Sequence, residues 1–178
     1  MSILIKITIG LAAFVALLAL IGMVLPKNFR IERSIEIAAP AGKIYPLIAD
    51  PHRWSKWGVW NQRDPNMTME FSGAALGVGA KWSWQSKSEG NGAMEFTAAD
   101  PDKRIAYKLT FVDFGMVSSG ALTLAPSGAG TGTTVSWTNA GEFGGNPFMR
   151  YFGLMMDRMV GKDFDAGLNN LKQLAEKP

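Results

Sequence analysis

The sequence contains no cysteine, one histidine and a formal net charge of only +3. Without cysteine there is no disulfide framework, thiol nucleophile, cysteine-ligated metal or lipid acylation on cysteine. The lone histidine, His52, has no companions at metal-ligand spacing, so no metal site is predicted. The G-x-S-x-G signature of a serine nucleophile is also missing. These absences leave hydrolase and metal chemistry without support, and no cofactor is predicted.

The charge is also too scattered for a protein that binds nucleic acid. Setting Lys6 aside with the N-terminal segment leaves 17 basic residues against 15 acidic ones, whereas nucleic acid requires a basic stripe or face. Hydrophobic residues make up 47% of the chain and charged residues 19%, a balance that supports a buried core. We therefore predict one folded domain over residues 27–178, with no nucleic acid among its partners.

The chain does contain one long apolar run, Ile7 to Leu25, without a charged residue. As a helix this run reaches about 28 Å, close to the thickness of the bilayer hydrocarbon. The alternative is a cleaved signal peptide, whose apolar region is usually only about 7–15 residues long and precedes a small-x-small site. The stretch from Gly22 to Pro26 offers no clear site of that kind. We therefore predict an uncleaved transmembrane anchor formed by residues 1–26.

The charges beside this run bear on its orientation. Lys27, Arg30 and Arg33 follow the run, whereas only Lys6 and the α-amino group precede it. Positive charge collects on the cytoplasmic side of a span, so this bias favours a cytoplasmic C-terminal domain. Part of the charge belongs to the first predicted strand, which weakens the bias. We predict a single-pass protein of the cell membrane with its folded domain in the cytoplasm.

Apolar and polar residues alternate from Phe29 to Ile37 and predict a half-buried first strand. Pro40 suits the first turn of a short helix, which contains Pro46 and ends at Asp50. A second short helix or an ordered loop is predicted for residues 52–66. This segment carries three tryptophans at intervals of three residues, namely Trp54, Trp57 and Trp60.

The alternation returns between Met67 and Asn139 and predicts six further antiparallel strands. Turns are predicted at residues 77–79, 90–92 and 127–132, with a break near Phe114. Asn146 and Pro147 then suit the start of a helix, and apolar residues at a spacing close to 3.6 extend it over about 28 residues. The predicted fold class is α+β, a curved seven-stranded antiparallel sheet around a long C-terminal helix. The space between helix and sheet is the candidate site.

These segments resemble a known family. Phe29 to Ile37 followed by Ala39-Pro40, then residues 44–51 with Trp54 and Trp57, resemble the opening of the START-related polyketide cyclase/dehydrase and lipid transport family of the SRPBCC superfamily. The turn at residues 77–79 before a Trp-bearing strand and the long closing helix are similar as well. The resemblance, over roughly residues 29–174, implies a helix-grip fold with an apolar cavity between the sheet and the last helix. Members include lipid carriers, hormone receptors, cyclases and chaperone activators, so the fold alone does not choose among them.

Aromatic and methionine side chains expected to face this cavity are the candidate ligand-binding residues. Core packing explains any one of them better, but ten methionines in one chain favour a surface that adapts to its contents. With Met156, the candidates on the strands and the last helix are Trp82, Trp84, Met94, Phe96, Tyr107, Phe111, Trp137, Phe152, Met155 and Met159.

Three polar residues, Arg33, Asp113 and Asn139, share strand parity with apolar neighbours and would point inward. Buried charges need partners or a polar ligand head, unless a strand end lets them reach solvent. Arg33 stays among the candidate ligand-binding residues, whereas Asp113, beside the break, is expected to reach solvent. The tryptophans of residues 52–66 are interpreted as core packing, a membrane-interface belt or a pocket lid. The glycines of the 127–132 turn open no helix, so they predict a hairpin rather than a phosphate loop.

Three functions remain open. The first is a binding module that holds an apolar small molecule or lipid beside the membrane. The second is a polyketide cyclase/dehydrase-like enzyme that draws an acid or base from Tyr107, Arg33 and Asn139. The third is a partner-binding or stress-response domain, which would need an exposed apolar patch on the outer sheet face at residues 106–112. We favour the first, because a tether keeps the cavity at a high local concentration of lipid, and we assign no catalytic residue.

Overall fold

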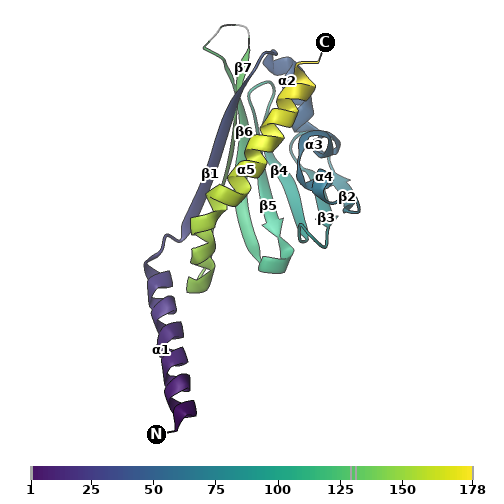
Figure 1. The fold of residues 1–178 in the computed structure, drawn as a ribbon. Coiled ribbons are helices and arrows are strands. Elements are labelled where there is room, and N and C mark those ends of the chain that lie inside the picture. The colour runs from purple at the N-terminus through teal and green to yellow at the C-terminus, as the bar shows by residue number, and fades with distance from the viewer. Residues whose placement is uncertain (1, 129, 131, 178) are drawn as a thin grey trace.

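The computed structural model describes residues 2–128, 130 and 132–177 and shows a helix that projects from a sheet-and-helix domain (Figure 1). The turn predicted at 127–132 includes positions 129 and 131, which lie outside the described residues. In chain order the elements are α1 (Ile3–Val24), β1 (Asn28–Ile37), α2 (Ala41–Ala49), α3 (Pro51–Trp57), α4 (Trp60–Arg63), β2 (Thr68–Gly73), β3 (Ala80–Gln85), β4 (Gly92–Asp100), β5 (Arg104–Phe111), the 3-10 turn η1 (Val112–Phe114), β6 (Met116–Pro126), β7 (Thr133–Glu142), the 3-10 turn η2 (Pro147–Met149) and α5 (Arg150–Ala175).

The strands form one antiparallel sheet in the order β1-β7-β6-β5-β4-β3-β2. The first strand therefore pairs with the last one, and the five others follow as a meander. In β1 the residues Phe29, Ile31 and Ile37 are buried while Arg30 and Glu32 are exposed, as the alternation predicts. The predicted α+β fold, a seven-stranded sheet with a long C-terminal helix, is confirmed.

The short helices follow local signals in the sequence. Asp50 caps α3, because its carboxylate accepts a hydrogen bond from the backbone N–H of His52 at 2.9 Å. Pro51 occupies the first turn of α3, where its missing N–H costs nothing. Residues 60–63 form a further short helix, α4, inside the segment predicted as a second helix or an ordered loop.

The break predicted near residue 114 is the 3-10 turn η1, which ends at Gly115 with φ of 58°. Asp113 in this turn is exposed, as predicted. Its carboxylate accepts hydrogen bonds from the backbone N–H of Asn91 at 2.7 Å and from the Asn91 side chain at 3.1 Å. The predicted helix start is divided in two, because Asn146 caps η2 by accepting from the N–H of Phe148, and α5 begins only at Arg150.

The second half of α5 packs closely on the sheet. The ring of Phe164 stacks on Trp137 of β7 with 3.9 Å between the centroids and 7° between the planes. Leu168 and Leu171, which follow at helical spacing, are buried as well. Gly167 makes this approach possible, because a Cβ there would already lie 3.1 Å from the Trp137 ring. The second half of α5 therefore closes the core.

The first half of α5 is different, because its apolar side chains are largely exposed. Phe152 is 57% exposed, Met155 56% and Met159 59%. This end of α5 lies where α1 leaves the domain, at the opposite end from the C-terminus (Figure 1). The helix α1 is long and apolar enough to cross a membrane, and Gly22 is its buried residue.

Candidate functional site

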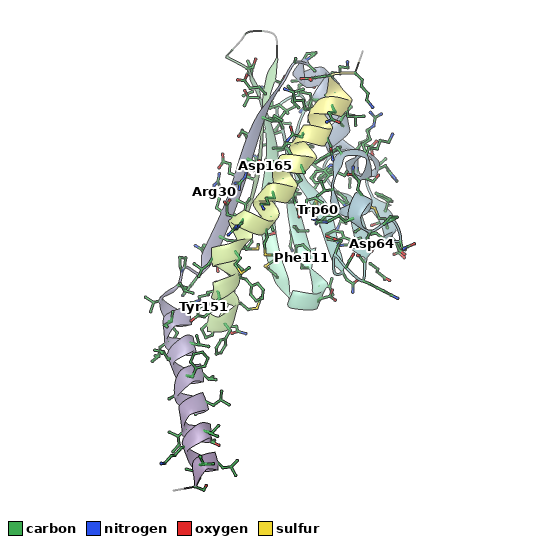
Figure 2. All side chains as sticks on the ribbon, in the orientation of Figure 1. Arg30, Trp60, Asp64, Phe111, Tyr151 and Asp165 are labelled. Atoms are coloured by element: carbon green, nitrogen blue, oxygen red, sulfur yellow. The ribbon has the colours of Figure 1, made fainter. Side chains whose placement is uncertain are left out.

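An apolar pocket lies between the β2–β5 half of the sheet and the segment of α3 and α4. Its volume is about 120 Å³. The pocket is lined by Trp54, Gly58, Trp60, Asn61, Met67, Met69, Trp82, Trp84, Glu89, Met94, Leu109 and Phe111. Figure 2 labels two of these residues, Trp60 on α4 and Phe111 at the end of β5.

Strand register builds the sheet wall of this pocket from two rows of side chains. One row crosses the strands β2 to β5 as Met69, Trp84, Gly92 and Phe111. The next row crosses the same strands as Phe71, Trp82, Met94 and Leu109. The last three line the pocket, whereas Phe71 stacks on His52 outside the lining. Because side chains alternate along a strand, residues two apart face the same side, and the rows together make one continuous apolar wall.

Gly92 leaves room in the first row for the indole ring of Trp84. A Cβ at this position would overlap the Cζ2 atom of Trp84 and lie 2.9 Å from the carbonyl oxygen of Thr110. The indole of Trp84 therefore occupies the space above the glycine and meets Phe111 edge to face, with 5.9 Å between the ring centroids. A larger residue at 92 would push this indole out of its place.

The helical wall is held in place by the tryptophans of α3. The indole N–H of Trp54 donates to the carbonyl of Ile48 at 2.8 Å, and that of Trp57 donates to the carbonyl of Leu47 at 3.0 Å. Both N–H groups are buried and satisfied, so the rings act as fixed apolar surfaces. Trp54 contacts Trp82 across the pocket with 5.4 Å between the ring centroids.

The polar side chains at the pocket already form hydrogen bonds or ion pairs within the protein. Asn61 donates to the sulfur of Met69 at 2.9 Å. Glu89 accepts a hydrogen bond from Arg63 at 2.8 Å, and the same guanidinium bonds Asp163 of α5 at 2.7 Å. These charge-assisted bonds raise the pKa of Arg63, with the bond to Asp163 as the largest cause. Arg63 thereby connects α4, the β3–β4 loop and α5 at the edge of the pocket.

The size of the pocket limits what fits in it. Pockets for drug-sized ligands measure about 300–1,000 Å³, whereas an apolar cavity of about 150 Å³ accommodates a benzene molecule. At about 120 Å³, this pocket has room for a single ring or for the end of an alkyl chain. A whole polycyclic ligand would have to extend beyond it.

Four of the predicted ligand-binding residues line this pocket, namely Trp82, Trp84, Met94 and Phe111. Three others, Phe96, Tyr107 and Trp137, are fully buried in the core beside it. The hydroxyl of Tyr107 accepts a hydrogen bond from the indole N–H of Trp137 at 2.9 Å, and burial raises the pKa of this phenol. Parity along a strand identified the buried face correctly, but it does not distinguish a pocket wall from packed core.

The remaining predicted residues on the last helix lie elsewhere. Phe152, Met155 and Met159 are on the exposed first half of α5, and Met156 is half-buried against the core. None of these four is among the residues that line the tryptophan-walled pocket. The tryptophan-lined pocket is therefore faced by α3 and α4 rather than by α5. A separate hollow of about 220 Å³ lies between β1 and the first half of α5, where Met156 is among its lining residues.

Arg33 does point toward α5, but into an ion pair. Its guanidinium bonds the carboxylates of Asp157 at 2.8 Å and Asp165 at 3.2 Å. The hydrogen bond to Asp157 raises the pKa of Arg33, and the same bond lowers the pKa of the Asp157 carboxyl. Gly161 leaves the room that the guanidinium needs, since a Cβ there would overlap it. Arg33 thus joins β1 to α5 and lies outside the pocket lining.

Sequence reasoning missed several lining residues. Of the three tryptophans interpreted as core packing, a membrane-interface belt or a pocket lid, Trp54 and Trp60 line the pocket and Trp57 is buried in the core. Met69 lies two residues before Phe71 on the same strand, so the alternation in the sequence already indicated that both face the same side. Met67 has the same parity, although β2 begins only at Thr68. Asn61, Glu89 and Gly58 are in loops or a short helix, where no periodicity marks the side that faces inward.

Comparisons with known proteins agree with this architecture. Solved structures with the same fold include a Thermobifida fusca protein (TM-score 0.62, 20% identity, 82% of this chain and 92% of the other). A Chromobacterium violaceum protein has the same fold (TM-score 0.59, 20% identity, 86% of this chain and 100% of the other). So does truncated norcoclaurine synthase from Thalictrum flavum (TM-score 0.61, 13% identity, 85% of this chain and 95% of the other). No curated protein matches the chain.

These identities are low, so the structural likeness shows the fold alone. The sequence comparison goes further, because the family described as polyketide cyclase/dehydrase and lipid transport matches residues 28–176, from the first residue of β1 to just beyond the end of α5. The matched region includes the whole sheet, the tryptophan-lined pocket and the closing helix. The chain therefore belongs to the polyketide cyclase/dehydrase and lipid transport family.

Proposed function

We propose that the protein binds an apolar small molecule or lipid and holds one ring or chain end of it in the tryptophan-lined pocket. The observation that carries this proposal is the pocket itself, whose lining is mainly aromatic and methionine side chains. Methionine sulfurs and large flat rings adapt to differently shaped apolar groups. The family description, which includes lipid transport, is consistent with such a ligand.

The proposed site of action is a membrane, to which residues 1–26 anchor the domain. The helix α1 has 22 residues and is about 33 Å long, enough to cross the bilayer hydrocarbon. Its apolar side chains are mostly exposed, and lipid would cover them. Hydrogen bonds from Arg150 and Tyr151 to carbonyls of α1 support a retained helix over a cleaved signal peptide. The basic residues after the span favour a cytoplasmic domain.

The enzyme alternative receives less support from the pocket. An acid–base mechanism needs polar groups that converge on the bound substrate. Asn61 and Glu89 line the pocket, but Asn61 donates to methionine sulfur and Glu89 is paired with Arg63. Of the three predicted candidates, Tyr107 bonds Trp137 and Arg33 bonds two aspartates of α5. The third, Asn139, is buried, donates to the hydroxyl of Ser118 at 3.2 Å and lies outside the pocket lining. The binding function therefore fits the arrangement better.

The protein-partner alternative requires an exposed apolar patch on the outer face of the sheet. That face carries Lys81, Ser83, Glu95 and Lys108 around β3 to β5, and Lys81 pairs with Glu95 at 3.2 Å. Within the predicted patch at residues 106–112, Ala106 is buried and Val112 is exposed. A single exposed valine beside charged neighbours does not favour partner docking by apolar contact.

Filling the pocket tests the binding function. We expect purified residues 27–178 to bind toluene in calorimetry and to release a lipid or other apolar compound on organic extraction, identified by mass spectrometry. Met69→Trp adds a ring at the pocket edge and should abolish both signals, whereas Phe71→Trp, two residues along the same strand and outside the lining, should keep them. Equal binding by the two variants, or none by the unaltered domain, would contradict the proposal.

A further inference from the structure

The start of α5 is fastened to the end of α1. Gly22 of α1 is buried against η2, and a Cβ there would lie 2.5 Å from the carbonyl oxygen of Pro147. The buried guanidinium of Arg150 donates to the carbonyls of Gly22, Met23 and Leu25 at 3.3, 2.7 and 3.3 Å. These carbonyls belong to the last turn of α1 and its C-cap residue, where no further turn is present to satisfy them. A cation also interacts favourably with the negative end of a helix dipole.

Tyr151 shows how far the start of α5 extends along α1. Its hydroxyl donates to the carbonyl of Leu18 at 2.7 Å. Leu18 precedes the last residue of α1, Val24, by six positions, which is about 9 Å along a helix axis. Figure 2 shows Tyr151 beside the upper end of α1, where α5 begins. The start of α5 therefore lies alongside the apolar helix rather than beyond its end.

The surface of this segment is apolar. From Asn146 to Met156 the one charged residue is Arg150, and its guanidinium is turned onto the α1 carbonyls. Phe148, Phe152 and Met155 repeat at helical spacing on one face and are exposed. The neighbouring Leu154 and, on α1, Val24 are exposed as well. This exposed surface is continuous with that of the candidate membrane helix.

We propose that residues 147–155 insert into the interface of the lipid bilayer beside α1 and dock the domain on the membrane in one orientation. The proposal rests on the proposed function in one respect, that α1 is a membrane anchor. If α1 spans the bilayer, its contacts with Pro147, Arg150 and Tyr151 hold the start of α5 at the level of the last turns of the span. Phe148, Phe152 and Met155 then meet lipid instead of water.

Docking of this kind also brings the edge of the pocket near the bilayer. Met159 continues the same apolar face by one turn, and Asp163 follows one turn further, where it bonds Arg63 at the pocket edge. From Met155 to Asp163 the helix rises about 12 Å.

Site-directed labelling tests the insertion, and the absence of cysteine makes single labels clean. Three full-length variants, Met155→Cys, Lys108→Cys and Phe14→Cys, would carry the environment-sensitive fluorophore NBD. They are reconstituted in vesicles of phosphatidylcholine and phosphatidylglycerol with a nitroxide either on the lipid headgroup or on the acyl chain. We expect a blue-shifted emission for the label at 155 and its quenching by both nitroxides, while the label at 108 stays in water and unquenched.

The label at residue 14 distinguishes a failure of the interfacial insertion from a failure of the membrane anchor. Quenching at 14 by acyl-chain nitroxide without quenching at 155 leaves the anchor in place and overturns the interfacial insertion. An unquenched label at 14 contradicts the anchor itself, and with it the proposed function. A blue-shifted label at 155 that no lipid nitroxide quenches would mean that a second copy of the chain covers this face, which also overturns the proposal.

Discussion

Gly92 lies across the sheet from Trp84 and leaves the space that the indole ring occupies. Alanine at this position would force the indole to move, because the added Cβ would overlap the ring and approach the backbone of β5. The free side of the ring faces the pocket, so the displaced indole would take up part of its volume of about 120 Å³. A single absent methyl group thus maintains the binding space.

We expect Gly92→Ala to weaken toluene binding strongly and to lower the free energy of unfolding by about 1–3 kcal/mol, the usual cost of an overpacked interior. Calorimetry and urea denaturation would measure the two effects. Gly145→Ala is the matched control, since nothing lies within 4 Å of a Cβ at that position. Unchanged toluene binding by the variant at 92 would show that the Trp84 indole moves away from the pocket rather than into it.

Residue patterns predict which side of a strand is buried, but not what that side meets. Trp84 and Trp137 show the same alternation, yet Trp84 lines a pocket and Trp137 is stacked under Phe164. Parity left open whether Arg33 points inward or reaches solvent, and its partners Asp157 and Asp165 lie more than 120 positions away in the chain. Only the packing of α5 on β1 brings these charges together.

Among the elements, α1 and α5 have the least predictable relationship. Each was recognised from its own sequence, α1 from its apolar length and α5 from its periodicity. The contact between them depends on Gly22, which is small enough for Pro147 to approach the helix backbone. A larger side chain at residue 22 would separate the two helices without shortening either of them.

We therefore expect Gly22→Val to release the start of α5 from the membrane. In vesicles, the NBD label at residue 155 should lose its quenching by acyl-chain nitroxide, while the label at residue 14 keeps it. Gly10→Val adds the same side chain to α1 where nothing lies within 4 Å, and it should leave both labels unchanged. Continued quenching at 155 in the variant at 22 would mean that insertion does not depend on the contact between α1 and η2.

At the scale of the whole molecule, the domain has its own core and a second apolar surface beside α1. The core packs the sheet against α2, α3 and the second half of α5, with Trp57 and Leu171 fully buried, and it needs no residue of α1. Removing α1 would expose Pro147 and Tyr151 and leave Arg150 without its carbonyl partners. The domain should survive this loss, but its attachment to membranes should weaken.

We expect residues 27–178 to unfold cooperatively on heating and to be extracted from membranes by alkaline carbonate, whereas the full chain resists extraction. Through Phe148, Phe152 and Met155, the shortened chain should still bind phosphatidylglycerol vesicles weakly in a flotation assay. The double variant Phe152→Ser with Met155→Ser should lose this residual binding and keep the same unfolding temperature. Full-length chain that alkaline carbonate extracts would argue against the anchor.

The sequence by itself determined the local order of this protein: which segments alternate, which helix is apolar all round and which face of each strand is buried. These properties depend on neighbours two to four positions apart, so periodicity reveals them. Tertiary structure alone decided that the pocket opens toward α3 and α4, that Arg33 meets aspartates of α5 and that Tyr151 lies beside Leu18. Those outcomes depend on how side chains far apart in the chain fill space together, which no local pattern records.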